Sequence, residues 1–327
     1  MAFALRIGSR PSALAMAQAN LIKDRLEGSV AGLRAEIVSI STTGDKLTTP
    51  SLAQVGGKGL FIRELEQALG DGRIDIAVHS MKDLPAVLPG AFRIAAIPQR
   101  EDPRDALITR NGGGWDALAA GARIGTSSPR RRLEVLRLRP DLDVTPLRGN
   151  VDTRLKRLEA GDFDAIVVAM AGLIRLERRA VANPIELDDE NFVPAGGQGA
   201  LAIEALAGSV IGASPELESA IAALNDLAAT AEVTAERSFL ATIGASCVSP
   251  VGIKGSIEGD SLRLRALLFS LDGTRSLVDQ AAAAHRLPAS PGKSAQSAKA
   301  MLEAATELGA LLGRRMLAQG ADEMIRP

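Results

Sequence analysis

The alternation of apolar and polar residues is clearest in the first third of the chain, where it predicts a helix followed by a strand. Apolar residues recur at three- and four-residue spacing across residues 60–69, and Gly70 and Gly72 then end the helical pattern. Residues 74–78 follow as a short apolar run rich in β-branched side chains, which is typical of a buried strand. Because ligands of open α/β sheets bind just beyond the carboxyl ends of strands, we expect a site in the loop formed by residues 79–85.

The same patterns predict strands and helices on either side of this loop. In the first part of the chain, we expect strands at residues 4–7, 36–41, 92–97 and 200–204, and helices from about 12 to 27 and from 216 to about 230. Toward the C-terminus, we expect a helix at 236–243, strands at 251–257, 262–270 and about 274–278, and a long helix from about 297 to 317. This C-terminal pattern is typical of a small α+β domain.

Two echoes in the sequence indicate that an α/β arrangement occurs twice. Residues 6–9 (Arg-Ile-Gly-Ser) are echoed by residues 123–126 (Arg-Ile-Gly-Thr), and the pattern Asp-x-x-Val-x-x-Met-x-x-Leu that begins at Asp75 recurs from Asp164. The offsets are 117 and 89 residues, so the loops between matching strands differ in length. We therefore predict two α/β domains of similar topology that face each other across a cleft.

The domain boundaries follow from the segments between these units. The charged segment 99–105 marks the expected crossing into the second domain, and residues 191–200, which are rich in glycine, mark the return. We predict a first α/β domain of residues 1–98 with 199–228, a second of 99–198, and a C-terminal α+β domain of 229–327.

Composition narrows the class of protein. The chain has 327 residues, of which 46% are hydrophobic and only 2% aromatic, so we expect aliphatic cores. The net charge of -1 and the pI of about 6.2 give no general attraction to nucleic acid or to an anionic membrane. One Cys excludes an internal disulfide and suits a reducing compartment, and one Cys with two His does not favour a metal site. Finding neither a signal peptide nor a run of about 18 apolar residues, we expect a cytoplasmic protein.

The predicted site loop carries an adjacent cation and acid, Lys82 and Asp83, with the hydroxyl of Ser80 just before them. The alternative is an ordinary solvated turn with a surface ion pair. Arg10 lies at an expected strand-to-helix junction, where unpaired backbone N–H groups and the helix dipole favour anions. The alternative there is a surface arginine beside a helix cap.

Positive charge is concentrated in the second predicted domain. Residues 123–159 hold ten basic and five acidic side chains, in a chain that is slightly acidic overall. Within this segment, Arg130 and Arg131 follow Ser127 and Ser128 at an expected helix start, so hydroxyls, backbone N–H groups and guanidinium donors coincide. We expect the cleft to bind a ligand with several carboxylates or phosphates.

Two further features have both a structural and a functional interpretation. Residues 56–59 (Gly-Gly-Lys-Gly) lack the spacing of a P-loop, but their glycines allow close backbone approach to a ligand or a mobile lid. Cys247 lies in a loop of small residues between Gly244 and Pro250. A lone Cys is most often buried and inert, and the functional interpretation is a thiolate that anchors another group.

Nine short motifs in a fixed order carry a resemblance to a known family. They are residues 6–10 (Arg-Ile-Gly-Ser-Arg), 56–61 (Gly-Gly-Lys-Gly-Leu-Phe), 79–85 (His-Ser-Met-Lys-Asp-Leu-Pro), 100–105 (Arg-Glu-Asp-Pro-Arg-Asp), 125–131 (Gly-Thr-Ser-Ser-Pro-Arg-Arg), 147–151 (Leu-Arg-Gly-Asn-Val), 171–175 (Ala-Gly-Leu-Ile-Arg), 194–199 (Pro-Ala-Gly-Gly-Gln-Gly) and 245–247 (Ala-Ser-Cys). In these motifs the chain resembles the porphobilinogen deaminase, or hydroxymethylbilane synthase, family over nearly its whole length.

The resemblance implies three domains, the first two like periplasmic binding proteins. It implies a transferase of porphyrin and heme biosynthesis that polymerises four porphobilinogen molecules into the linear tetrapyrrole hydroxymethylbilane, with release of ammonia. It also implies one covalent dipyrromethane cofactor per chain on a cysteine thioether, for which Cys247 is the candidate. We expect a cytoplasmic monomer that binds porphobilinogen, and neither nucleic acid nor a membrane.

The resemblance also assigns roles to individual residues. Asp83 matches the family's catalytic aspartate, which hydrogen-bonds pyrrole N–H groups and stabilises a cationic pyrrole. The same residue is the proton source for the departing amine, and Lys82 orients this carboxylate or compensates its charge. The second echo has Gly172 at the place of Asp83, so we expect one such acid in the cleft. The remaining predicted binding residues are Arg10, Ser12, Asp45, Lys58, Ser80, Thr126, Ser127, Ser128, Arg130, Arg131, Arg148, Arg154 and Arg175. Gln54, where some members have Lys, and the additional Arg132 depart from the family pattern.

Two alternatives belong to other functional classes. A cytoplasmic solute-binding or effector-sensing module for a polycarboxylate would share the two-domain cleft, but it would need neither Asp83 nor Cys247. A nucleic-acid binder would use the basic segment 123–159, but the scarcity of aromatic residues and the pI argue against it.

Overall fold

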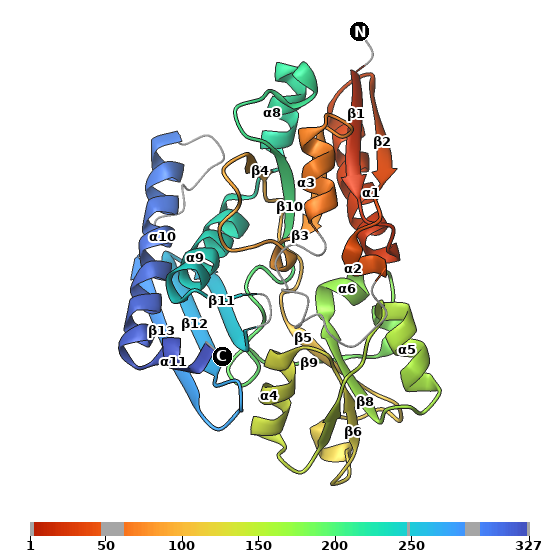
Figure 1. Cartoon of the computed structure of the whole chain (residues 1–327), viewed down its shortest axis with the longest axis vertical. Coiled ribbons are helices and arrows are strands. Elements are labelled where there is room, and N and C mark those ends of the chain that lie inside the picture. The colour runs from red at the N-terminus through yellow and green to blue at the C-terminus, as the bar shows by residue number, and fades with distance from the viewer. Residues whose placement is uncertain (1–2, 47–61, 247–248, 285–294, 326–327) are drawn as a thin grey trace. The chain divides into compact units, whose positions relative to one another are not determined.

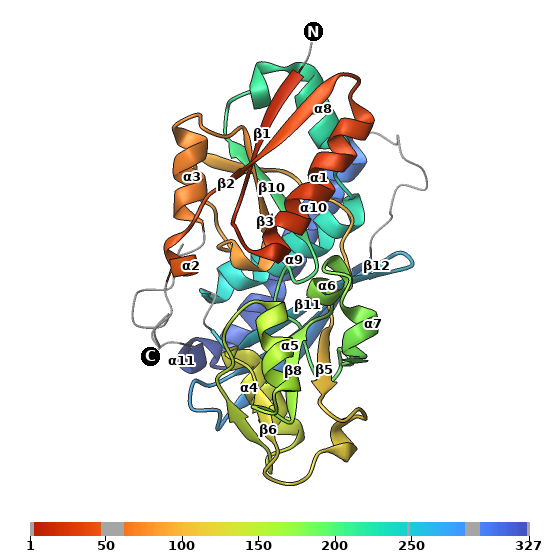
Figure 2. The same ribbon diagram turned by 90° about the vertical axis from the view of Figure 1, so that its right-hand side faces the viewer.

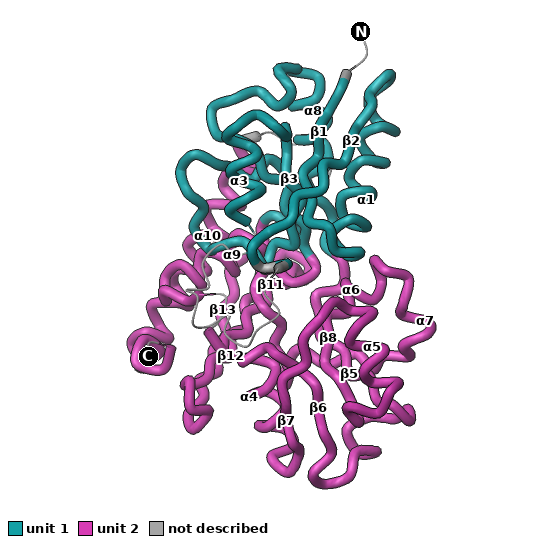
Figure 3. The backbone as a smooth tube through the Cα atoms, turned by 45° about the vertical axis from the view of Figure 1, so that its right-hand side comes forward, with its two compact units in different colours: residues 1–100, 200–230 teal, residues 101–199, 231–327 magenta. Residues whose placement is uncertain are grey.

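The computed structural model describes residues 3–46, 62–246, 249–284 and 295–325. The chain divides into two compact units, one of residues 1–100 with 200–230 and one of residues 101–199 with 231–327 (Figure 3). Each unit contains an α/β half, and the second unit also contains a separate three-stranded sheet with its helices (Figure 1). This mixed α/β architecture confirms the predicted fold class.

The first half is a five-stranded sheet with the strand order β2-β1-β3-β10-β4. Strand β1 is parallel to β2 and β3, whereas β10 is antiparallel to β3 and β4. The strands are β1 (Phe3–Ser9), β2 (Leu33–Ser39), β3 (Ile76–Ser80), β4 (Phe92–Ala96) and β10 (Leu201–Leu206). The helices are α1 (Ala13–Ser29), α2 (Thr43–Lys46), α3 (Arg63–Gly70), η1 (Met81–Asp83), η3 (Ile211–Ala213) and α8 (Pro215–Ala223).

Helices cover both faces of this sheet, and the alternation of strand side chains decides which residue meets which helix. Ile76 and Val78 of β3 pack with α1 on one face, and Ala77 packs with α3 on the other (Figure 2). Ser12 begins α1, because its hydroxyl accepts a hydrogen bond from the amide of Ala15 at 3.3 Å. The η1 turn thus follows a strand that is buried on both faces.

The second half repeats this plan with the strand order β7-β6-β8-β5-β9. Here β6 is parallel to β7 and β8, and β5 is antiparallel to β8 and β9. The strands are β5 (Asp105–Thr109), β6 (Arg123–Gly125), β7 (Asp143–Thr145), β8 (Ala165–Ala169) and β9 (Ile185–Glu186). The helices are η2 (Trp115–Ala117), α4 (Pro129–Leu138), α5 (Val151–Glu159), α6 (Met170–Arg175) and α7 (Arg179–Ala182).

The two sequence echoes occupy matching places in the two sheets. The carboxylate of Asp75 accepts a hydrogen bond from the amide of Arg6 at 2.7 Å, and that of Asp164 accepts one from the amide of Arg123 at 2.8 Å. In return, the amide of each aspartate donates to the carbonyl of the same arginine at 2.9 Å. The similar topology of the two halves is therefore confirmed, and the cleft between them stays a prediction.

The C-terminal part is an antiparallel sheet with the order β11-β12-β13, covered by long helices. Its elements are α9 (Leu227–Ile243), β11 (Val251–Glu258), β12 (Ser261–Phe269), β13 (Ser276–Ala284), α10 (Ala295–Ala318) and α11 (Ala321–Ile325). Helices α9 and α10 meet at small residues: a Cβ added to Gly309 would lie 2.1 Å from the carbonyl oxygen of Ala235. No described helix is long and apolar enough to cross a bilayer.

The buried carboxylate of Glu236 joins this C-terminal part to the second half. It accepts hydrogen bonds from the amides of Gly197 at 2.6 Å and Gly255 at 2.7 Å, and thereby ties the segment before β10 to strand β11. A small apolar cluster adds to the same contact; its members are Leu133, Val193, Leu267 and Phe269.

Two expected elements differ from the structure. The single helix predicted at 216–230 is broken into α8 and α9, because Asp226 caps α9 through the amide of Ala229 at 2.8 Å. The side chain of Asn225 meanwhile accepts a hydrogen bond from the amide of Ile97 at 2.8 Å. The last predicted strand, at about 274–278, is longer and runs as β13 (Ser276–Ala284), because it pairs with β12 along its full length.

Candidate functional site

The η1 turn places Lys82 and Asp83 at the carboxyl end of β3. The amide of Met81 donates to the carbonyl of Ala200 at 3.0 Å, and the amide of Leu84 donates to the carbonyl of Met81 at 3.1 Å, so the turn is held by the backbone. Asp83 is exposed, and its carboxylate has no hydrogen-bond or ion-pair partner among the described residues, whereas Lys82 is half-buried and engaged. The turn is thus fixed, while the carboxylate remains available to a ligand.

A buried amide that the sequence interpretation missed lies beside this turn. Gln18 is 3% exposed on the inner face of α1, and its Nε2 donates to the hydroxyl of Ser80 at 2.9 Å. A polar residue among the buried positions Ala15, Ala19 and Ile22 is the signal that could have identified it. Ser80 therefore already has a partner within the protein.

At the end of β1, two predicted binding residues are brought together. Arg10 forms an ion pair with Asp45 at 2.5 Å, and Asp45 also accepts hydrogen bonds from the amide and hydroxyl of Thr42 at 3.0 and 2.8 Å. Burial opposes ionisation of Asp45, but the hydrogen bonds from Arg10 and Thr42 outweigh it and lower its pKa. Ser12, predicted to bind, serves as the cap of α1.

In the second half, the predicted hydroxyl groups organise the loop between β6 and α4. Ser128 is the cap of α4 and accepts a hydrogen bond from the amide of Arg131 at 3.4 Å. Thr126 accepts one from the amide of Ser128 at 3.2 Å, and the exposed Ser127 donates to the carbonyl of Leu147 at 2.8 Å. These contacts join the loop after β6 to the loop after β7, where Arg148 lies half-buried and engaged.

The structure places Arg130 and Arg131 in a buried ionic cluster rather than at the surface. Arg130 is 4% exposed and pairs with Asp105 and Glu134 at 2.7 Å each. Arg131 is 6% exposed and pairs with Asp105 at 2.7 Å, and its Nη2 donates a hydrogen bond to the side-chain oxygen of Gln198 at 3.3 Å. Both guanidinium groups therefore hold the fold of this half together, and their predicted contact with a ligand stays a prediction.

The two carboxyl groups of this cluster differ in acidity. Burial opposes ionisation of Asp105, but the charges of Arg130 and Arg131 outweigh burial and lower its pKa. For Glu134, burial dominates and, together with the charge of Asp105, raises the pKa to about 8 against the attraction of Arg130. The two guanidinium groups thus surround one strongly acidic carboxyl, Asp105, and one weakened acid, Glu134.

Arg154 adds a further positive charge that has no acidic partner. Its Nε donates to the carbonyl of Gly149 at 2.8 Å, and no carboxylate lies within ion-pair distance among the described residues. Burial, and then the positive charge of Arg131, lowers the pKa of Arg154 to about 10. A half-buried guanidinium that is repelled by a neighbouring cation favours an anion from outside the chain.

The remaining predicted residues fall into two groups. Arg175, at the end of α6, donates to the carbonyl of Gly199 at 2.6 Å and is otherwise engaged. Cys247, Lys58 and Gln54 lie outside the described residues. The additional Arg132 is exposed, as expected for a departure from the pattern.

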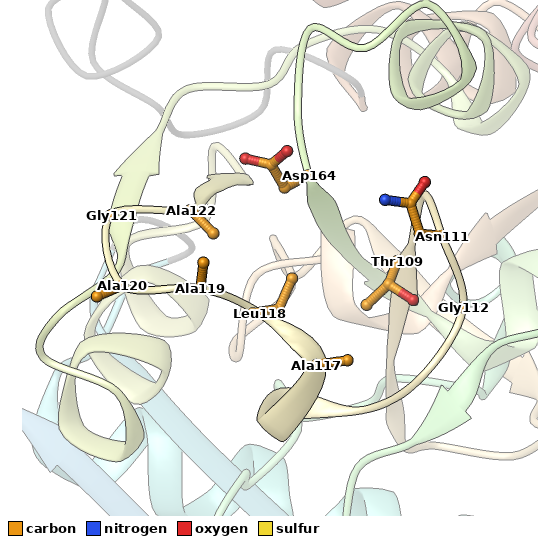
Figure 4. Close-up of a pocket in the computed structure, with 10 residues that line it drawn as sticks. All are labelled: Thr109, Asn111, Gly112, Ala117, Leu118, Ala119, Ala120, Gly121, Ala122 and Asp164. Atoms are coloured by element: carbon orange, nitrogen blue, oxygen red, sulfur yellow. The ribbon is translucent and has the colours of Figure 1, made fainter.

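The predicted site residues do not line the cavity of about 370 Å³ in the second half (Figure 4). Its lining includes Thr109, Ala122 and Asp164. Thr109 is the last residue of β5, Ala122 directly precedes β6, and Asp164 directly precedes β8. The cavity is therefore at the amino ends of the parallel strands, whereas the loops with Thr126 and Arg148 follow their carboxyl ends. We assign no ligand to this cavity.

Two solved structures illustrate a distant likeness in fold. A nutrient-binding protein from Burkholderia cenocepacia bound to methionine shares a TM-score of 0.40 and 11% identity, over 67% of this chain and 91% of that chain. The VFT2 domain of BvgS from Bordetella pertussis shares a TM-score of 0.39 and 16% identity, over 68% of this chain and 86% of that chain. Neither carries an argument about this protein.

Sequence relatives are much closer. Porphobilinogen deaminase of Roseiflexus castenholzii is 46% identical over 269 residues, which is 82% of this chain and 87% of that protein. The enzyme of that name from Syntrophotalea carbinolica is 43% identical over 323 residues, which is 98% of this chain and 95% of that protein.

Two family models cover most of the chain. Residues 5–210 match "Porphobilinogen deaminase, dipyromethane cofactor binding domain", and residues 230–318 match "Porphobilinogen deaminase, C-terminal domain". The chain therefore belongs to the porphobilinogen deaminase family.

Proposed function

We propose that this protein is a porphobilinogen deaminase that joins porphobilinogen units into the linear tetrapyrrole hydroxymethylbilane and releases ammonia. Each porphobilinogen carries an acetate and a propionate, so the growing chain is a polyanion that needs uncompensated positive charge in the protein. The observation that carries the proposal is Arg154, a half-buried cation beside Arg131 without a carboxylate partner in the described structure. Family membership supplies the substrate class for this anion site.

The residues of the second half fit the dipyrromethane cofactor that the family carries. The guanidinium group of Arg154 beside Arg131 suits its carboxylates, and Arg148 lies in the loop after β7 while Arg175 ends α6. Cys247 would hold it through a thioether. When bound, the cofactor supplies the pyrrole terminus to which new pyrrole units are joined. The segment before Cys247 is positioned by Gly244, which ends α9 with a φ of 70°, and by Ser246, whose amide donates to Ser249 at 3.0 Å.

In the first half, Asp83 performs the acid–base and electrostatic work. Its exposed carboxylate can accept hydrogen bonds from pyrrole N–H groups and stabilise the cation that forms when porphobilinogen loses its amine. In its protonated form it can donate to the departing amine. Lys82, adjacent and engaged, would orient or compensate this carboxylate.

The proposed division of the chain follows the same roles. The first α/β domain supplies Asp83, the second supplies the anion-binding arginines, and the C-terminal domain carries Cys247. The lid role of the loop with Lys58, a cytoplasmic monomer, and the absence of nucleic acid and membrane partners stay predictions.

The test is turnover of porphobilinogen by the purified protein, followed by ammonia release and by the appearance of a linear tetrapyrrole. We expect one ammonia for each porphobilinogen consumed. A solute-binding module would bind porphobilinogen and return it unchanged, and that result would exclude the proposed enzyme.

A further inference from the structure

A buried histidine–glutamate pair that the proposed mechanism does not use lies on the two strands that hold the η1 turn. His79 Nε2 lies 2.9 Å from Glu204 Oε2, and the two side chains are 4% and 0% exposed. The second carboxylate oxygen, Glu204 Oε1, is buried and has no hydrogen-bond partner in the part of the chain that the structure describes. Such an unsatisfied buried acceptor costs stability, so its presence in the core calls for an explanation.

The second half shows that the fold itself does not require this pair. In β3 and β10, His79 is paired with Ala202 and Glu204 with Ala77. The matching residues of β8 and β5 are Val168, which is paired with Ala106, and Ile108, which is paired with Ile166. At the two positions where the first half has a histidine and a glutamate, the second half therefore has two aliphatic residues.

These two aliphatic residues pack well. Val168 and Ile108 are 2% and 3% exposed and belong to one apolar cluster of the second half. Because well-packed apolar residues are often as stable as a buried ion pair or more so, the same exchange in the first half should be tolerated. The histidine–glutamate pair thus occupies two positions at which aliphatic side chains would also be compatible with the fold.

The pair lies where it can control the η1 turn. His79 is the penultimate residue of β3, and the turn with Asp83 begins two residues later. Glu204 is on β10, which follows Ala200, the residue whose carbonyl holds the amide of Met81. The side-chain bond between His79 and Glu204 therefore connects the same two strands that the backbone of the turn connects, on the sheet face covered by α3.

Glu66 of α3 provides further evidence that the carboxyl group of Glu204 faces this helix. Burial, and then the negative charge of Glu204, raises the pKa of Glu66, so the carboxylate of Glu204 acts on the helix that covers it. His79 is the side chain with which Glu204 makes its short contact.

We propose that His79 and Glu204 form a positioning pair that fixes the strand ends carrying the η1 turn and so holds Asp83 in its reactive orientation. This inference rests on the proposed function, since Asp83 has a reaction to perform only in a deaminase. Neither side chain needs to touch the substrate.

The test exchanges the pair for its counterpart in the second half, as His79→Val with Glu204→Ile. We expect kcat to fall by about ten- to a hundredfold, because a small misplacement of a catalytic group has effects of this size. KM should change little, and the melting temperature should stay the same or rise. The cofactor content, measured as added mass after denaturation, should equal that of the wild type.

Two further variants separate positioning from other roles. Glu204→Gln keeps an oxygen that can accept a hydrogen bond from His79 Nε2–H, so kcat should remain within about threefold of the wild type, the equivalent of about 0.6 kcal/mol. Ile203→Val trims the same strand on its opposite face and should leave kcat unchanged. If the double variant fails to fold, the kcat values of the single variants His79→Gln and Glu204→Gln are compared with that of the wild type instead. Both variants retain hydrogen-bonding groups at the substituted position.

The outcomes are distinguishable from failure of the proposed function. If the wild-type protein does not consume porphobilinogen, the proposed function is wrong. If the wild type is active and the double variant keeps its kcat, the positioning role is wrong. A loss of kcat in Glu204→Gln as large as in the double variant would also overturn positioning, because the charge rather than the hydrogen bond would then matter.

Discussion

The two α/β halves have the same sheet topology but use it for opposite charges. After β3, the first half exposes the carboxylate of Asp83, whereas the matching position after β8 is the buried Gly172. After β6 and β7, the second half gathers the buried Arg130 and Arg131 and the cation Arg154, which has no carboxylate partner among the described residues. The comparison teaches that a repeated scaffold fixes where the loops lie, while single substitutions on those loops decide which half carries an exposed acid and which half carries the additional cations.

The largest expected effect is on the acid of the first half. Asp83→Asn removes the ionisable group but keeps the shape, so we expect kcat to fall by about 10²- to 10⁴-fold, as for loss of a general acid–base catalyst. Because Asp83 is exposed and has no described partner, the melting temperature should not change. Steady-state turnover beside thermal unfolding measures both, and a variant with wild-type kcat would remove Asp83 from the mechanism.

The next effect concerns the buried anion of the second half. Asp105→Leu installs the residue that the first half has at the matching position, Leu201. It leaves Arg130 and Arg131 without their shared carboxylate, so we expect a loss of about 3–5 kcal/mol in the free energy of unfolding.

Denaturant unfolding measures this loss, and the surface pair of Arg139 and Asp141 provides the control. Asp141→Asn removes a carboxylate that is 38% exposed, so it should lower the free energy of unfolding far less than Asp105→Leu does. Equal costs for the two variants would contradict a structural role for the buried cluster.

A smaller effect is expected at Arg154, the cation that has no carboxylate partner among the described residues. Arg154→Gln removes charge-assisted hydrogen bonds to a ligand carboxylate, so kcat/KM for porphobilinogen should fall by about 10- to 100-fold, equivalent to about 1.5–3 kcal/mol. Stability should not decrease, because burial and Arg131 both disfavour this charge in the folded chain. Arg157→Gln, on the same helix but paired with Asp162, is the control and should leave kcat/KM unchanged.

The pH dependence of stability tests the charge state of the same half. Glu134 has a raised pKa of about 8, so the folded chain binds a proton that the unfolded chain releases above about pH 4.5. Stability should therefore fall as the pH rises from about 4.5 to 8, by at most about 1.4 kcal/mol per pH unit. Glu134→Gln should flatten this slope, and an unchanged slope in chemical unfolding curves would assign it to another group.

The smallest expected effect compares the two helix caps that precede α1 and α4. Ser12→Ala and Ser128→Ala should each cost about 1 kcal/mol of stability, because each serine accepts a hydrogen bond at the start of its helix. Ser12→Ala should leave kcat within twofold of the wild type. A large loss of kcat without loss of stability would instead show that Ser12 contacts the ligand.

Local patterns in the sequence predicted the repeated topology and the position of the Asp83 turn, because hydrophobic periodicity and glycine stops are local signals. Contacts between distant residues were not predictable in this way. Asp105 is 26 residues from Arg131, and no periodic pattern relates them, so the structural role of the two buried arginines was not predicted. Glu134, four residues after Arg130 on one helix, was the one member of that cluster that spacing could have revealed.

The most direct test of this division of roles is the intact mass, under denaturing conditions, of Asp83→Asn and Arg154→Gln after incubation with porphobilinogen. The account predicts that Asp83→Asn carries the full added mass of two linked pyrrole units but gains no further units. Arg154→Gln should carry that added mass on only a fraction of its molecules, because a cation that receives the cofactor's carboxylates is missing. Equal cofactor loading and equal extension in the two variants would contradict the assignment of the acid to one half and the anion site to the other.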